Sequence, residues 1–228
     1  MKTLNDFFEH IYCINLPHRN DRWEEISKEF AKHLLVVEKV EAIDGKKFFK
    51  PGLNRHAGAY GLVLTNINIF EDAKAKGYKS ILILEDDISF VDDMSEKFWN
   101  KIEHLPNDWN LLYLGGNNQF HAGKFEMITG DKSVQILKEN YNTFNYELVR
   151  TRWTQSSYAV GYNGNIIEDF LKRLKNYTEP IDVLLPQLQN QEIYKSFVFL
   201  PTLAKHIDGF SDISGLYVEY TKSPANNF

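Results

Sequence analysis

Three consecutive acidic residues, Glu85, Asp86 and Asp87, follow the aliphatic run from Lys79 to Leu84. Adjacent carboxylates directly after a buried strand are unfavourable unless a cation or solvent compensates their charge. In an extended segment, Glu85 and Asp87 lie on one side of the chain and Asp86 lies on the other. Two carboxylates on one face suit a hard divalent ion that also binds substrate phosphates, and the alternative is a solvated acidic turn.

Two arginines, Arg19 and Arg22, occur in the motif INLPHRNDRW, directly after the first apolar run of the chain. The planar guanidinium group matches the geometry of phosphate oxygens, so these residues are candidate partners of a diphosphate. Alone, they are equally compatible with solvated arginines in the first turn of a helix. Together with the acidic residues, they predict a nucleotide-diphosphate site that uses a metal ion.

These candidate residues need a scaffold, and the pattern of the chain predicts an α/β sheet. Short apolar runs alternate with amphipathic segments, which is typical of a mostly parallel sheet flanked by helices. In such sheets, ligands bind at the carboxyl ends of the strands. The expected strands are 11–15, 35–43, 79–84, 111–114, 156–162 and 197–200, and the expected helices are 20–33, 58–76, 94–104, 166–174 and one after Pro180.

The alternation stops after Gly115. Residues 116–150 are rich in Asn, Gly, Phe and Lys, and we expect them to form a loop or hairpin on the acceptor side of the site. We expect the tail, 222–228, to be frayed. No stretch has the composition of a linker, so the sequence predicts one catalytic domain over 1–228.

Composition narrows the function classes. The chain has 228 residues, a formal net charge of −5 and 43% hydrophobic residues, which fits a globular protein and argues against nucleic-acid binding. It has no apolar run near the ~20 residues that a membrane span needs, and its first residues do not resemble a signal peptide. With Cys13 as the single cysteine, a cytosolic location in a bacterium or a virus-infected host is the simplest expectation. The sequence does not indicate an oligomeric state.

The chain resembles glycosyltransferase family 25, the lipopolysaccharide and procollagen galactosyltransferase family. The resemblance runs in the family's order from about Ile11 to Gly215, and ILILEDDISF is its most specific motif. The other motifs are IYCINLPHRNDRW, AIDG, HAGAYGLVLTNINIF, DWNLLYLGG, TQSSYAVGYNG, EPID and LPTLAKHIDGFSDI.

The resemblance implies a GT-A fold, a UDP-galactose or UDP-glucose donor, a Mn²⁺ cofactor and inversion at the anomeric carbon. The acceptor would be a glycan or a protein that carries hydroxylysine. Glu85, Asp86 and Asp87 would form the equivalent of the DxD motif: Asp87 binds the metal, and Glu85 or Asp86 reaches the ribose or a metal-bound water. Glu85 is also a candidate metal ligand. Oxygen ligands alone would accept Mg²⁺ as well.

Further site residues follow from the resemblance. His206 is a candidate late metal ligand, although a lone histidine is more often structural. Asn15 and Asp44 join Arg19 and Arg22 as candidate donor-binding residues, and Asp44 is otherwise a turn residue. Asp182 is the candidate general base that takes the proton of the acceptor hydroxyl, and its alternative role is an acid at a helix N-terminus.

The sequence departs from the family pattern at two positions. Ala59 stands where the family usually has Glu, and Asn66 replaces the histidine of its LSH motif. These changes motivate an alternative function, a degenerate homologue that binds a nucleotide sugar or glycan without turnover. A third hypothesis is a metal-dependent nucleotide hydrolase, for which water is the favoured acceptor.

Overall fold

The structure, a computed structural model, describes residues 2–48, 57–118, 125–129, 132–135, 147–176, 179–213 and 215–220. Its helices are α1 (Asn20–Lys32), α2 (Ala57–Lys76), α3 (Met94–Ile102), α4 (Ile167–Lys175) and α5 (Ile181–Asn190). Its first strands are β1 (His10–Asn15), β2 (Glu38–Glu41), β3 (Ser80–Glu85), β4 (Ile88–Phe90), β5 (Leu111–Asn118), β6 (Phe125–Thr129) and β7 (Lys132–Gln135). They are followed by β8 (Glu147–Thr151), β9 (Thr154–Asn163), β10 (Ser196–Leu200), β11 (Ala204–His206), β12 (Gly209–Ser211) and β13 (Leu216–Val218).

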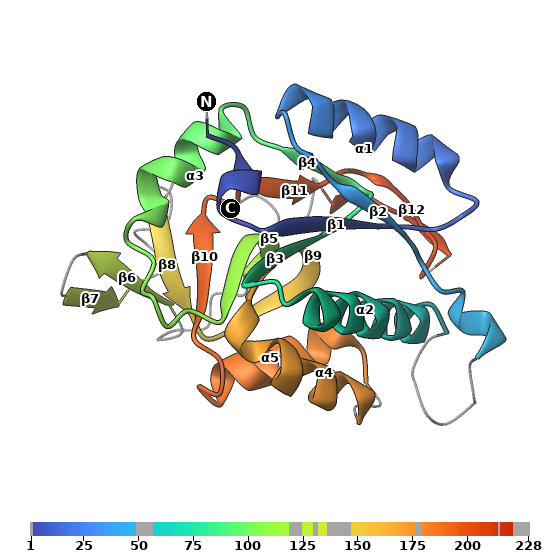
Figure 1. The fold of residues 1–228 in the computed structure, drawn as a ribbon. Helices are drawn as coiled ribbons and strands as arrows, with labels where there is room; N and C mark the ends of the chain where they lie inside the picture. The colour runs from blue at the N-terminus through green and yellow to red at the C-terminus, as the bar shows by residue number, and fades with distance from the viewer. Residues whose placement is uncertain are drawn as a thin grey trace.

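A central sheet organises the fold, with the strand order β2-β1-β3-β9-β5-β10-β8-β6-β7 in the part of the chain that the structure describes (Figure 1). β1 is parallel to β2 and β3, and β5 is parallel to β10. β9 lies between β3 and β5 and is antiparallel to both. The predicted α/β class with a helix-flanked sheet is confirmed. The sheet is mixed, because β9, β8 and β7 are each antiparallel to their neighbours.

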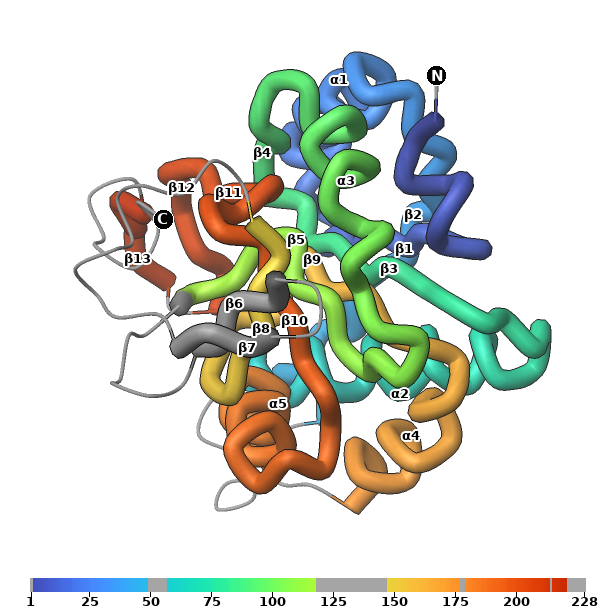
Figure 2. Tube along the Cα trace, turned by 90° about the vertical axis from the view of Figure 1, so that its left-hand side faces the viewer, coloured from blue at the N-terminus to red at the C-terminus, as the bar shows by residue number. Residues whose placement is uncertain are grey.

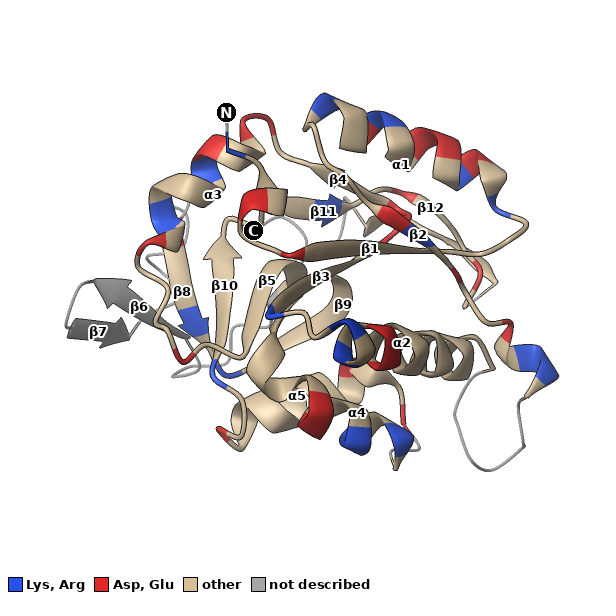
Figure 3. Ribbon diagram, viewed as in Figure 1, with Lys and Arg blue, Asp and Glu red and all other residues tan. Residues whose placement is uncertain are grey.

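Helices cover both faces of this sheet. α1 and α3 lie on one face, and α2, α4 and α5 lie on the other (Figure 1). Side-chain alternation along β1 explains the two cores: Ile11 and Cys13 pack towards α1 and α3, whereas Tyr12 and Ile14 pack towards α2. Charged residues lie mostly on the helices and connections, while the central strands are almost free of them (Figure 3).

Two expected strands differ in length from the observed ones. The expected strand 35–43 is reduced to β2, because Leu34 adopts a positive φ of 54° and Leu35 donates a backbone hydrogen bond back to Phe30. The expected strand 111–114 continues as β5 to Asn118. Its register against β9 shifts on either side of Gly115, so bulges carry the strand past the expected stop.

The described part of the segment 116–150 is mostly β-strand, as in a hairpin, rather than an irregular loop. β6 and β7 form an antiparallel hairpin, and β6 and β8 add to the same sheet. The rest of this segment, like the tail 222–228, lies outside the described residues, and its role on the acceptor side stays a prediction.

Candidate functional site

The candidate residues gather where β3 ends. The chain leaves β3 at Glu85, turns through Asp86 and Asp87 and enters β4, which pairs with β11 in an antiparallel ribbon. The backbone N–H of Ile207 donates to the carbonyl of Asp87 at 2.9 Å, so the end of β11 is attached to the acidic turn. Figure 2 shows that β4, β11 and β12 lie along one side of the molecule.

Glu85, Asp87 and His206 form one cluster. One potential ligand atom from each lies within 4.8 Å of the other two, and His206 Nε2 is 3.5 Å from Asp87 Oδ1. The grouping of Glu85 with Asp87 is the one that strand alternation predicts. The structure therefore brings together the three residues that the sequence nominates as metal ligands.

Asp86 points to the other side of the turn, where Asn15 and Arg22 compensate its negative charge. Asn15 donates a 2.6 Å hydrogen bond to its Oδ2, and Arg22 donates a 2.9 Å bond to its Oδ1. The same nitrogen of Arg22 donates to Asp87 Oδ2 at 3.0 Å, and its second terminal nitrogen donates to the Phe210 carbonyl. Arg22 is thus the counter-ion of the acidic turn, and it also attaches β12 to that turn.

The cluster has the properties of a cation site. Among the described residues, Asp87 Oδ1 and both ring nitrogens of His206 are buried without a hydrogen-bond partner. Burial raises the pKa of Glu85 well above its ordinary value, and the charges of Asp87 and Asp182 raise it further. Burial lowers the pKa of His206, so its imidazole tends to be neutral, as ligation requires. A divalent cation would satisfy these atoms and favour the ionised carboxylates, so the residues present fit a metal ion.

Asp182 lies next to this cluster, at the start of α5. Ser157 of β9 connects the two: its hydroxyl is 3.4 Å from Glu85 Oε1, and it also hydrogen-bonds Asp182. Burial raises the pKa of Asp182, an effect that the bond with Ser157 partly offsets. Asp182 Oδ1 is buried without a hydrogen-bond partner among the described residues. A half-buried carboxyl with a raised pKa is a suitable proton acceptor once it is ionised.

Among the described contacts, the side chains of the remaining candidates pair with residues outside the acidic turn. Arg19 is paired with Asp21 at 2.9 Å and with Asp212 at 2.5 Å. Asp44 is exposed, and its carboxylate caps a short 3₁₀ helix by accepting from the N–H of Lys46. The structure therefore shows a turn role for Asp44 and ion pairs for Arg19, and a role of either in donor binding stays a prediction.

Three functional candidates were missed by reasoning from the sequence: Ser157, Tyr158 and Tyr220. The first two lie in the motif TQSSYAVGYNG, which marks the strand but does not show which side chains reach the cluster. The ring of Tyr158 lies 4.0 Å from that of His206, and the ring of Tyr220 lies 4.4 Å from it. No sequence signal distinguishes Tyr220 from its exposed neighbour Tyr217.

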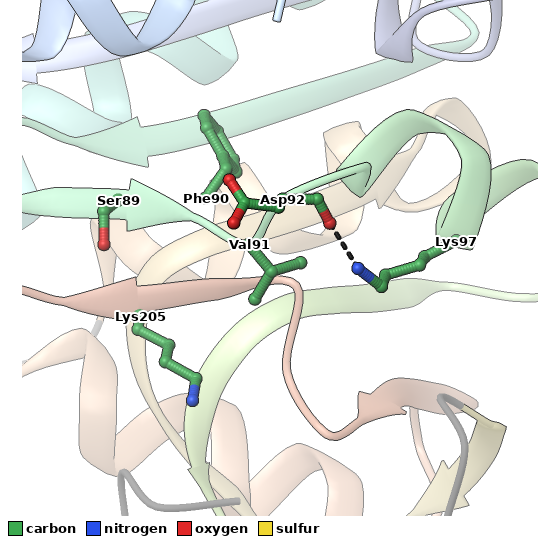
Figure 4. Close-up of a pocket in the computed structure, with 6 residues that line it drawn as sticks. All are labelled: Ser89, Phe90, Val91, Asp92, Lys97 and Lys205. Carbon is green, nitrogen blue, oxygen red and sulfur yellow. Dashed lines mark hydrogen bonds between the residues drawn. The ribbon is translucent and has the colours of Figure 1, made fainter.

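A separate cavity of about 380 Å³ lies on the β4–β11 ribbon (Figure 4). Its lining includes Ser89 and Lys205, which are cross-strand partners. Because side chains alternate along a strand, these residues point away from the face that carries His206. The cavity is therefore distinct from the acidic cluster. Over the part of the chain that the structure describes, no helix combines the length and apolar character of a membrane span.

Comparisons with known proteins agree with the motifs. The sequence model described as "Glycosyltransferase family 25 (LPS biosynthesis protein)" matches residues 8–185. Procollagen galactosyltransferase 1 of Danio rerio is 26% identical over 47% of the chain, and this match spans 21% of that protein. The inactive glycosyltransferase 25 family member 3 of Homo sapiens is 23% identical over 62% of the chain and 27% of its own length. The chain thus spans only about a quarter, or less, of these relatives.

Among solved structures, the chain is similar to a glycosyltransferase involved in the glycosylation of the major capsid of PBCV-1. The TM-score is 0.33 and the identity is 12%, over 80% of this chain and 66% of that one.

Proposed function

Because the chain belongs to glycosyltransferase family 25, we propose that it is a glycosyltransferase that moves a hexose from a UDP-sugar to an acceptor hydroxyl. Galactose and glucose are the sugars that we expect. The observation that carries the proposal is the cluster of Glu85, Asp87 and His206 at the carboxyl end of β3. Donors of this kind place a diphosphate at such a strand end, where a cation can bind it.

Glu85, Asp87 and His206 would bind the cation, for which we propose Mn²⁺. Two carboxylates and an imidazole suit Mn²⁺ better than Mg²⁺, because Mg²⁺ prefers an all-oxygen environment. When bound, the ion neutralises the negative charge that develops on the departing diphosphate. Asp87 can contribute Oδ1 to it while Oδ2 keeps its bond to Arg22.

The arginines and the amide organise the donor side. Arg22 and Asn15 together bind Asp86 and so set the geometry of the acidic turn. Arg19 lies at the same β1–α1 corner, with its guanidinium shared between Asp21 and Asp212. We propose that the donor diphosphate binds near this corner and competes with Asp212 for Arg19.

Asp182 is the residue that we propose as the general base. In an inverting transfer, the acceptor oxygen forms a new bond to the anomeric carbon while the bond from that carbon to the diphosphate oxygen breaks. The electron pair of the broken bond leaves with UDP, and the hydroxyl proton passes to the carboxylate of Asp182. Ser157 orients that carboxylate, and burial raises its proton affinity.

The acceptor and the cellular location belong to the same proposal. We expect a glycan or a hydroxylysine-type protein acceptor, with 116–150 on the acceptor side of one catalytic domain. Cys13 is buried and unpaired among the described residues, which fits a reducing compartment such as the cytosol.

A degenerate binding protein is the second candidate function, and two positions favour it. Asn66 is buried and donates to the Leu62 carbonyl of its own helix, so it does not replace a catalytic imidazole. Ala59 is buried in α2 as well. The name of one relative, "Inactive glycosyltransferase 25 family member 3", describes an inactive member of the family.

Release of UDP separates these functions. The protein is incubated with UDP-galactose or UDP-glucose and Mn²⁺, with and without galactoside and hydroxylysine acceptors. A transferase releases UDP faster when its acceptor is present, and a nucleotide hydrolase releases it equally fast without one. Binding of the donor without any UDP release would favour the degenerate homologue.

A further inference from the structure

The imidazole of His206 contacts the rings of two tyrosines. The ring centroid of Tyr158 is 4.0 Å from that of His206, at an interplanar angle of 39°. The ring centroid of Tyr220 is 4.4 Å from that of His206, at an interplanar angle of 37°. The His206 side chain is only 9% exposed, although no described side chain hydrogen-bonds its ring nitrogens. Ring contacts, rather than hydrogen bonds, therefore determine how this imidazole is oriented.

The first of these two rings, that of Tyr158, belongs to the hydrophobic core. Tyr158 is 1% exposed, and its hydroxyl donates to the carbonyl of Ala204 at 3.4 Å. Its ring also packs directly on Gly115, where an added Cβ would lie 2.1 Å from the ring edge. Core packing and this hydrogen bond therefore hold the Tyr158 ring in place beside His206.

The second ring belongs to Tyr220, which follows β13 in the chain. β12 and β13 form a hairpin, and Arg22 attaches that hairpin to the acidic turn through the Phe210 carbonyl. Tyr220 is half-buried, and the charges of Asp87 and Glu85 contribute to the raised pKa of its hydroxyl, after burial as the main cause. The charges of the carboxylates that His206 faces therefore act on the Tyr220 hydroxyl as well.

We propose that Tyr220 is a positioning residue: with Tyr158, it orients the His206 imidazole for binding a divalent cation. The inference rests on the proposed function, because it assumes that the cluster binds a metal. Without the second ring, the imidazole is free to rotate away from Asp87, because among the described residues its nitrogens make no hydrogen bond and only Nε2 lies near a charged atom, 3.5 Å from Asp87 Oδ1. Residues that orient a metal-binding histidine typically change metal affinity by roughly 10- to 100-fold.

Calorimetric titration with Mn²⁺ alone, without donor or acceptor, tests the inference. We expect Tyr220→Ala to raise the Kd for Mn²⁺ about tenfold or more. Tyr220→Phe, which keeps the ring, should bind like the wild type. Tyr217→Ala is the matched control, because this tyrosine of the same hairpin is 67% exposed and makes no ring contact with His206 among the described residues. If Tyr220→Ala does not fold, Tyr220→Leu replaces it, with the same expected loss.

A second measurement detects the contact between the His206 and Tyr220 rings in the absence of any metal. In the NMR spectrum of the apo protein, the ring protons of His206 should be shifted upfield by the flanking rings, move downfield in Tyr220→Ala and stay in place in Tyr220→Phe. Wild-type Mn²⁺ affinity in Tyr220→Ala would overturn the positioning role alone. A wild-type protein that binds no Mn²⁺ would overturn the metal site itself, and the positioning role with it.

Discussion

Asp87 Oδ1 and His206 Nε2 face each other at 3.5 Å, and neither atom has a hydrogen-bond partner among the described residues. The two residues are far apart in the sequence and meet because β11 pairs with β4 directly after the acidic turn. The other oxygen of Asp87 is bonded to Arg22. One carboxylate oxygen of Asp87 thus pairs with the Arg22 guanidinium, and the other is available to bind a metal ion.

The first prediction concerns this carboxylate. Asp87→Asn should abolish the rise in melting temperature that Mn²⁺ causes in the wild-type protein, because a neutral amide is a poor ligand for the ion. A thermal-shift series in Mn²⁺ and in EDTA measures it, with Asp92→Asn as the control, since Asp92 is exposed and pairs with Lys32. An equal Mn²⁺ shift in Asp87→Asn would exclude Asp87 as a ligand.

The second prediction concerns the counter-ion. Arg22→Ala should destabilise the protein by about 3 kcal/mol, because it leaves the largely buried Asp86 and Asp87 without their cation. Lys28→Ala is the control: it removes an exposed pair with Glu25 and should cost less than about 1 kcal/mol. Urea denaturation measures both. Similar losses in the two variants would show that Arg22 is not the compensating charge.

The third prediction tests the proposed base. Asp182→Asn should lower the single-turnover rate by about 10² or more, the usual contribution of a positioned base. Donor affinity should be almost unchanged, because the lost interaction belongs to the transition state. Asp169→Asn is a suitable control, since this residue lies on α4 and pairs with Arg173. A normal rate in Asp182→Asn would remove Asp182 from the mechanism.

The fourth prediction follows from the raised pKa of Asp182. Its ordinary value is 3.8, and burial raises the pKa in the folded state. As pH rises above 3.8, the unfolded chain loses this proton while the folded protein keeps it, so the stability contributed by Asp182 falls until the folded pKa is passed. Above the folded pKa, the contribution is constant.

In the metal-free protein, the melting temperature of Asp182→Asn should therefore rise relative to the wild type as pH increases from 4 upwards. The asparagine does not titrate, so the difference between the two melting curves reports the titration of Asp182 together with its effect on the pKa of Glu85. A difference that is constant with pH would contradict a raised pKa.

Much of the fold was predictable because it depends on local patterns. The aliphatic run of β3 and the amphipathic periodicity of α1 and α4 mark these elements directly, and Gly77, with its φ of 71°, ends α2 as expected. The direction of β9 was not predictable, since strand pairing depends on long-range contacts that one sequence does not reveal.

The site was predictable only in part, for a similar reason. The consecutive acids and His206 are visible as residue types, and the structure places them together. The partners of Arg22 are not visible, because the bonds to the acidic turn and to Phe210 depend on how α1 and β12 pack. The same holds for Tyr220, whose position beside His206 depends on the β12–β13 hairpin.

Donor binding tests the central claim most directly, namely that Glu85, Asp87 and His206 form a cation-dependent sugar-nucleotide site. Calorimetry with UDP-galactose and UDP-glucose, in Mn²⁺ and in EDTA, measures it for the wild type and Asp87→Asn. We predict that the wild type binds one of these donors in Mn²⁺, that EDTA weakens this binding at least tenfold, and that Asp87→Asn binds equally weakly in both. Donor binding that is unchanged by EDTA in the wild type would contradict the account.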